Sequence, residues 1–159
     1  MLKQLGMAAA ALAMLAQPGL ADSQQVMTGF RYAYAHPHCA PWDGAATRIV
    51  IQDVPYKVPG PDKLPVEHFP QYSVALWTGH PEVGRWIEVG PDFAKHGGGS
   101  ISVCPAQGKC DWRSGRVRIT KLTPDSMTGE LRIDAPGHTG RDQVFTFTAP
   151  IIHLRMFCG

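Results

Sequence analysis

The segment His36-Pro37-His38-Cys39 places two histidines two residues apart, a spacing that could serve a metal ion. Side chains at positions i and i+2 of an extended chain point to the same face, as copper and zinc sites in β proteins often require. Further ligands would have to come from His68, His80, His96, His153 or Met156. The alternative is an ordinary strand end, where Pro37 interrupts the hydrogen-bond ladder and Cys39 is oxidised. Because two ligands alone do not make a metal site, the sequence favours the strand end, and copper or zinc stays the alternative cofactor.

The chain has four cysteines, at positions 39, 104, 110 and 158. An even number of cysteines in an exported protein predicts two disulfide bonds. We expect Cys104 to pair with Cys110, because the proline and glycine between them suit a tight loop. Cys39 then pairs with Cys158. A structural zinc site is the alternative, but five residues separate the two central cysteines and zinc knuckles are shorter.

Two further segments are candidates for recognition. Trp112 and Arg113 follow Cys110, and these residue types are enriched at interface hot spots. They form either an exposed recognition tip or a cap in which Trp112 folds back over the disulfide. The second segment, Asp53–Pro70, contains five prolines and reads as an excursion from the sheet. Its Tyr56 and Phe69, together with Trp42, could line a groove for a peptide or a sugar.

No catalytic set can be assembled from the sequence. The carboxylates are scattered, and nothing marks two of them as facing partners for acid–base chemistry. The segment His96-Gly97-Gly98-Gly99 resembles the oxyanion loop of lipase-like hydrolases, but the Gly-x-Ser-x-Gly elbow that this loop serves is absent from the sequence. We therefore predict no catalytic residue and expect this glycine-rich stretch to be a hairpin loop.

The composition limits the classes of function. The chain has 159 residues, of which 44% are apolar and 18% charged, which is enough for a packed core and excludes wholesale disorder. The 17 glycines and 14 prolines favour a turn-rich fold over a helical one. The 15 basic and 13 acidic side chains nearly balance, so no strong field would attract nucleic acid or an anionic membrane.

Residues 1–21 have the pattern of a cleaved signal peptide. Lys3 provides the positive charge, an apolar run covers residues 5–16, and small residues precede Asp22. The run is shorter than the roughly 20 residues of a membrane-spanning helix. We therefore expect a periplasmic or secreted protein whose mature part, residues 22–159, is a single domain without membrane insertion.

The elements that must position these residues read as β-strands. Short alternating or β-branched runs cover residues 26–34, 47–52, 72–77, 85–89, 100–104, 116–122, 129–134, 143–149 and 151–157. They predict an all-β fold, an antiparallel sandwich or barrel of about eight to nine short strands. The strands between residues 116 and 149 should form a meander because their connections are short. The alternation places five charged residues on one solvated face: Arg116, Arg118, Glu130, Arg132 and Asp134.

The sequence thus favours a non-enzymatic, exported, disulfide-stabilised binding module for a protein or carbohydrate partner. The long Pro/Gly-rich loops and the lack of a catalytic set motivate this hypothesis. The alternative is a periplasmic metal-binding protein that uses His36 and His38. A small hydrolase is the third hypothesis, and it has no nucleophile–base pair to support it.

Overall fold

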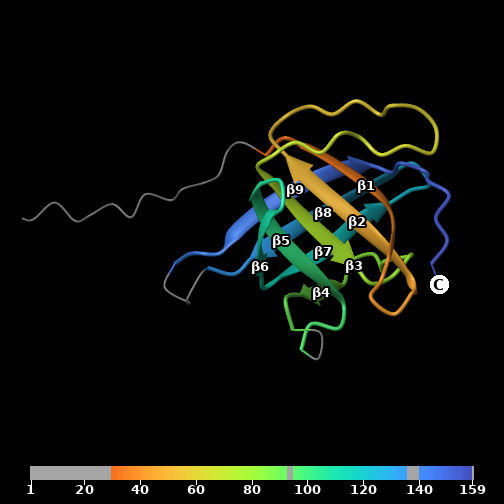
Figure 1. The fold of residues 1–159 in the computed structure, drawn as a ribbon. Coiled ribbons are helices and arrows are strands. Elements are labelled where there is room, and N and C mark those ends of the chain that lie inside the picture. The colour runs from red at the N-terminus through yellow and green to blue at the C-terminus, as the bar shows by residue number, and fades with distance from the viewer. Residues whose placement is uncertain (1–29, 93–94, 136–139, 159) are drawn as a thin grey trace, which may run out of the picture.

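The computed structural model describes residues 30–92, 95–135 and 140–158, and these residues form nine strands and no helix (Figure 1). The first four strands are β1 (Tyr32–Cys39), β2 (Ala45–Gln52), β3 (Gln71–Leu76) and β4 (Trp86–Val89). The remaining five are β5 (Gly99–Ala106), β6 (Lys109–Arg113), β7 (Gly115–Leu122), β8 (Ser126–Ile133) and β9 (Gln143–Pro150). A helix long and apolar enough to cross a membrane is not found in the described ranges. The predicted signal peptide, residues 1–21, lies outside them.

The strands form two antiparallel sheets that pack as a β-sandwich, as the alternation predicted. The five-stranded sheet has the order β1-β2-β3-β5-β6, and the four-stranded sheet has the order β4-β7-β8-β9. Backbone hydrogen bonds connect the sheets at two seams. Ile152 N donates to Ala35 O over 2.7 Å beside β1, and Gly90 N donates to Gly99 O over 3.1 Å beside β5. The predicted meander is present, because β7, β8 and β9 pair in chain order.

The main core lies between the inner faces of the two sheets. Ile49, Val74 and Ile101 from the five-stranded sheet are fully buried against Val117 and Leu131 from the four-stranded sheet. Alternate residues of β7 and β8 point outward, so the charged face that the sequence predicted is also formed. Period-two hydrophobicity along β7 and β8 therefore decides which of their side chains enter this core.

A second, smaller core covers the outer face of β1 and β2. Tyr34, Val50 and Ile152 are buried there, with Tyr56 and Leu154 packed against them. The Asp53–Pro70 excursion supplies Tyr56, and the C-terminal tail after β9 supplies the residues beyond 150. Figure 1 shows the excursion as a long loop beside β1 and β2. Part of the excursion, around Tyr56, thus packs against the outer face of the five-stranded sheet.

Both predicted disulfide bonds are present. The Cys104–Cys110 bond crosses the β5–β6 hairpin, whose turn contains Gly108 at a φ of 71°, a left-handed conformation that favours glycine. The Cys39–Cys158 bond joins the end of β1 to the tail. No free cysteine is left in the chain, since these bonds use all four.

Two strand predictions differ from the structure, and one strand was not predicted. The first strand covers Tyr32–Cys39 instead of residues 26–34, of which 26–29 lie outside the described part. The sequence missed β6, because its residues are mostly exposed at the sheet edge and have no apolar alternation. Residues 151–157 were predicted to form a strand, but they do not; only Ile151 forms an isolated β-bridge, with Ala35. Ile152 and Leu154 pack into the second core without a strand partner.

Candidate functional site

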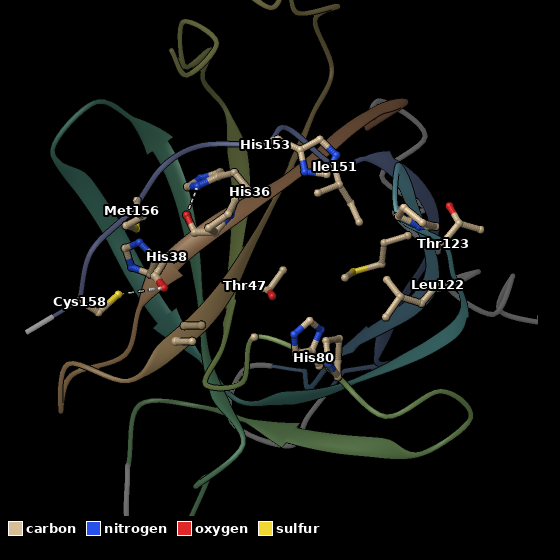
Figure 2. A pocket seen from close by; sticks show the side chains of 17 residues that line it. His36, His38, Thr47, His80, Leu122, Thr123, Ile151, His153, Met156 and Cys158 are labelled. Carbon is tan, nitrogen blue, oxygen red and sulfur yellow. Dashed lines mark hydrogen bonds between the residues drawn. The ribbon is translucent and has the colours of Figure 1, made fainter. Parts of the chain in front are cut away.

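A cavity with a volume of about 530 Å³ opens beside the second half of β1 (Figure 2). Its walls come from β1, the start of β2, the loop after β3, the β7–β8 turn and the C-terminal tail. We call it the histidine pocket, because four of the seven histidines of the chain line it together with one exposed methionine. These residues are His36, His38, His80, His153 and Met156. The sequence had named all five as potential ligands, but it could not predict that they share one cavity.

His36 has one ring nitrogen occupied and one available. The ring is buried, with 2% of the residue exposed, and its Nδ1 lies 2.7 Å from the carbonyl oxygen of Pro37. A carbonyl oxygen only accepts, so Nδ1 carries the hydrogen and donates it. Nε2 has no hydrogen-bond partner among the described residues, so its lone pair is free. Burial lowers the pKa of His36, which keeps the ring neutral at pH 7.

His38 lies beside His36 on the same face of β1. The ring centroids are 6.2 Å apart and the planes cross at 83°. Burial, and then the charge of Arg48, lower the pKa of His38 as well. A metal–nitrogen bond of about 2.0 Å places the centroid of an imidazole about 3.2 Å from the metal. The two rings are therefore close enough for one ion to bridge them in a nearly linear arrangement.

The C-terminal tail brings Met156 to this pair. Cys158 is bonded to Cys39, and its Sγ lies 3.7 Å from the carbonyl oxygen of His38. Met156 is two residues earlier, and 39% of it is exposed. Figure 2 shows its side chain on the same side of the pocket as the rings of His36 and His38. The disulfide thus holds the tail segment that carries Met156 on the wall of the pocket to which His36 and His38 also belong.

The other two pocket histidines lie elsewhere on the wall. His153 Nε2 is 3.5 Å from Asp125 Oδ1, and both side chains are largely exposed, so this contact contributes little to stability. His80 is exposed on the loop after β3. Within the described residues, no three His, Cys, Asp or Glu side chains form a group that could hold a metal ion. A site built from imidazole alone is therefore incomplete in this pocket.

His68 and His96, the two remaining candidate ligands, do not line the pocket. Nδ1 of His96 lies 2.9 Å from the carbonyl oxygen of Asp92 inside the glycine-rich loop. His68 belongs to the excursion.

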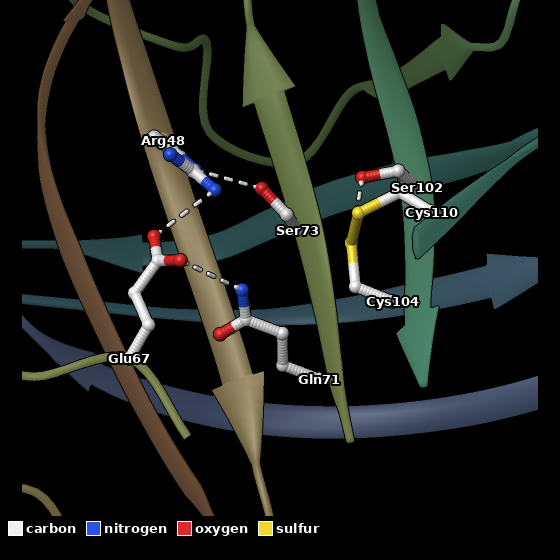
Figure 3. The surroundings of a disulfide bond; sticks show 7 residues. All are labelled: Arg48, Glu67, Gln71, Ser73, Ser102, Cys104 and Cys110. Carbon is white, nitrogen blue, oxygen red and sulfur yellow. Dashed lines mark hydrogen bonds and ion pairs between the residues drawn. A yellow bond between two sulfur atoms is a disulfide. The ribbon is translucent and has the colours of Figure 1, made fainter. Parts of the chain in front are cut away.

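Arg48 places a positive charge beside the histidine pair, and the excursion neutralises it. Arg48 lies opposite His36 in the β1–β2 register. Its Nε donates to Ser73 Oγ over 2.8 Å, and its Nη2 lies 3.4 Å from Glu67 Oε1 (Figure 3). Gln71 Nε2 donates to the other oxygen of Glu67 over 3.4 Å. The Arg48–Glu67 pair therefore has no net charge and attaches the excursion to the sheet.

The structure separates the residues of the predicted aromatic groove. The ring of Tyr56 packs on that of Tyr34 with centroids 4.8 Å apart, so it belongs to the second core. Phe69 is half-buried at the end of the excursion. Trp42 packs against Trp77, with centroids 5.4 Å apart. Tyr56 and Phe69 stay candidate binding residues, but the packing of Tyr56 on Tyr34 and of Trp42 on Trp77 places these two rings in different clusters.

Trp112 and Arg113 lie on β6, at the open edge of the five-stranded sheet. Trp112 is 60% exposed, which favours the exposed tip over the interpretation in which it folds back over the disulfide as a cap. Arg113 Nη2 lies 3.8 Å from Asp111 Oδ2 on the same strand.

The outer face of the four-stranded sheet carries an aromatic–arginine cluster that the sequence did not predict. The guanidinium carbons of Arg116, Arg118 and Arg132 lie 5.0, 4.7 and 4.9 Å from the centre of the Trp86 ring. Glu130 accepts a hydrogen bond from Arg118 Nη2 over 2.9 Å and from Arg132 Nε over 2.8 Å. The alternation indicated the charges, but the position of Trp86 depends on how β4 pairs with β7.

Comparisons of the chain with protein families, with curated proteins and with solved structures gave no match. The chemistry of the histidine pocket must therefore be argued from its own residues.

Proposed function

We propose that this protein binds a transition-metal ion in the histidine pocket and is not an enzyme. One observation carries the proposal: residues from β1, the loop after β3 and the tail place four histidines and a methionine around one cavity. Imidazole nitrogen is a good ligand for copper, zinc and nickel. Of the two functions that the sequence left open, the geometry favours the metal-binding one.

The environment of His36 supports the proposal. Metal-ligating histidines usually donate their second ring N–H to a carbonyl or carboxylate, which fixes the tautomer and the ring orientation. The contact from Nδ1 to Pro37 O is of this kind and leaves Nε2 for the metal. A ligand must also be neutral when the metal arrives, and burial favours that state.

The proposal includes export to an oxidising compartment, periplasmic or extracellular. Two disulfide bonds support it, because such bonds persist mainly outside the cytosol. The signal-peptide pattern of residues 1–21 agrees with it.

A thermal-shift screen of the purified mature protein against Cu²⁺, Cu⁺, Zn²⁺ and Ni²⁺ salts tests the proposal. An ion that binds only the folded state stabilises it by about 2.7 kcal/mol at one hundred times its Kd. We expect at least one of these ions to raise the Tm of the wild type and to lose this effect in His36→Gln and His38→Gln. The matched control is His68→Gln, outside the pocket, which should respond as the wild type does. Unmoved midpoints with all four ions at excess would refute metal binding.

Binding of a protein or carbohydrate partner is the second candidate, and the exposed edge strand favours it. β6 is the last strand of its sheet, where Trp112 is 60% exposed and Arg113 is half-buried. Exposed Trp and Arg are frequent anchors of interfaces. Trp112→Ala should then abolish capture of that partner from a periplasmic or culture extract and leave the metal response unchanged. Equal capture by both proteins would argue against this surface.

A further inference from the structure

We propose that the histidine pocket is selective for copper(I), bound by His36 Nε2, His38 and the thioether sulfur of Met156. This inference rests on the proposed metal-binding function and names the ion and the third ligand. Three properties of the pocket support it: the absence of charge in the donor set, the number of donors, and the way in which the tail is held.

The first property is the neutral donor set. Among the described residues that line the pocket there is no carboxylate, and the two imidazoles and the thioether carry no charge. The neighbouring Arg48 is already paired with Glu67. The donor set therefore supplies no negative charge to compensate that of a bound ion. The cost of burying an ion rises with the square of its charge, so a dication costs about four times as much as a monocation. The site thus favours a monovalent metal.

The second property is the number and softness of the donors. Zinc in proteins is bound by three or four N, S or O ligands in tetrahedral geometry, and the described residues offer no such group here. Copper(I) accepts two or three ligands, and soft thioether sulfur selects it. The 6.2 Å between the ring centroids of His36 and His38 suits a nearly linear pair of nitrogen ligands. Met156 then completes a three-coordinate site.

The third property is the covalent attachment of the tail. Residues 151–158 contain the ligand Met156 and the bonded Cys158, and Cys39 Sγ lies 3.9 Å from the carbonyl oxygen of Phe157. The bond holds the thioether near β1 without using a thiol as ligand. All four cysteines are in disulfides, so only histidine and methionine remain as soft donors. Such donors can hold copper(I) where free thiols would be oxidised.

The test is a titration of the oxidised mature protein with Cu⁺ under anaerobic conditions, in competition with a chromogenic copper(I) chelator. Ag⁺ serves as a second probe, because it has the same charge and softness and does not change oxidation state. The variants are Met156→Leu, which removes the sulfur but keeps the size, and His36→Gln. The matched control is Met127→Leu, which changes a buried methionine on another wall of the same pocket.

We expect one Cu⁺ or Ag⁺ per chain and a sulfur neighbour in the X-ray absorption spectrum of the copper complex. Met156→Leu should lower the affinity for both ions by at least about tenfold and remove the sulfur signal. Tenfold is the smallest loss usually seen when a residue that only supports a metal ligand is changed, so the loss of a ligand itself should be at least as large. Met127→Leu should bind as the wild type does. Thermal unfolding of the metal-free variants checks that each is folded.

Two outcomes would overturn the inference, and they are distinguishable. If His36→Gln loses metal but Met156→Leu binds Cu⁺ and Ag⁺ like the wild type, then the thioether is not a ligand, and the proposed metal-binding function stands without it. If neither variant alters binding of any ion, the proposed function fails as well. A loss in Met127→Leu equal to that in Met156→Leu would show a general effect on the pocket and would also overturn the inference.

Discussion

The Cys39–Cys158 disulfide joins the last residue of β1 to the penultimate residue of the chain, with the Cα atoms 5.5 Å apart. The bond therefore closes almost the whole described domain into one loop. It also fixes the tail that supplies one wall of the histidine pocket and Ile152 of the second core. A single covalent link serves both the stability of the fold and the geometry of the site.

Removing this bond should cost more stability than removing the hairpin bond. Residue separations of 119 and 6 give loop-entropy contributions of about 5 and about 2 kcal/mol. The measurement is urea unfolding of two double variants, Cys39→Ser with Cys158→Ser and Cys104→Ser with Cys110→Ser. Equal losses would show that the tail is held by packing and that the bond adds little to it.

The lowered pKa of the Glu130 carboxyl group leads us to expect a specific dependence of stability on pH. The hydrogen bond from Arg132, followed by that from Arg118, lowers the pKa of Glu130 below its ordinary value of 4.5. A lowered folded-state pKa means that the carboxylate stabilises the fold above about pH 4.5 and that this contribution is lost as the pH falls through the folded-state pKa. Glu130→Gln should therefore be less stable than the wild type at pH 7, and this difference should shrink as the pH falls through the folded-state pKa of Glu130.

The control for this pH dependence is Asp53→Asn, which removes an exposed carboxylate from the excursion. Its Tm should follow that of the wild type across the same range. A difference between Glu130→Gln and the wild type that does not change from pH 7 to pH 2 would contradict the role given to the carboxylate charge.

Two aromatic substitutions should differ in their effect on the free energy of unfolding, because one removes a packed side chain and the other an exposed one. Tyr56→Ala should destabilise the protein by about 1–3 kcal/mol, because it removes a ring from the second core and uncovers Tyr34. Trp112→Ala should change stability by no more than about 0.5 kcal/mol, because the indole is mostly exposed. Chemical denaturation measures both. A small effect of Tyr56→Ala would show that this ring contributes little to the second core, as expected for a residue of the surface groove that the sequence predicted.

The Trp86 ring should stabilise the four-stranded sheet through its three arginine contacts. Exposed cation–π contacts contribute about 0.5–1 kcal/mol each, so the loss of all three in Trp86→Leu should cost about 1.5–3 kcal/mol. Trp86→Phe keeps an aromatic face and should lose less. If the two variants are equally stable by thermal unfolding, the ring acts only through its apolar area.

Much of the fold followed from local patterns. Val117, Ile119, Leu131 and Ile133 alternate with polar residues, and alternation decides which face of a strand is buried whatever the rest of the chain does. The tight loop between Cys104 and Cys110 likewise indicated their pairing, and the remaining pair was then determined. β6 was not predicted, because this mostly exposed edge strand has no alternation of apolar and polar residues.

The sequence alone indicated an all-β chain, a preferred pairing of its four cysteines and a histidine pair with metal-ligand spacing. Only the tertiary structure decided that His80, His153 and Met156 line the same cavity as that pair, and that Tyr56 is packed while Trp112 is exposed. The physical reason is that these arrangements depend on contacts between segments far apart in the chain. The bond from Cys39 to Cys158 spans 119 residues, and no local preference encodes where such a bond places the side chains beside it.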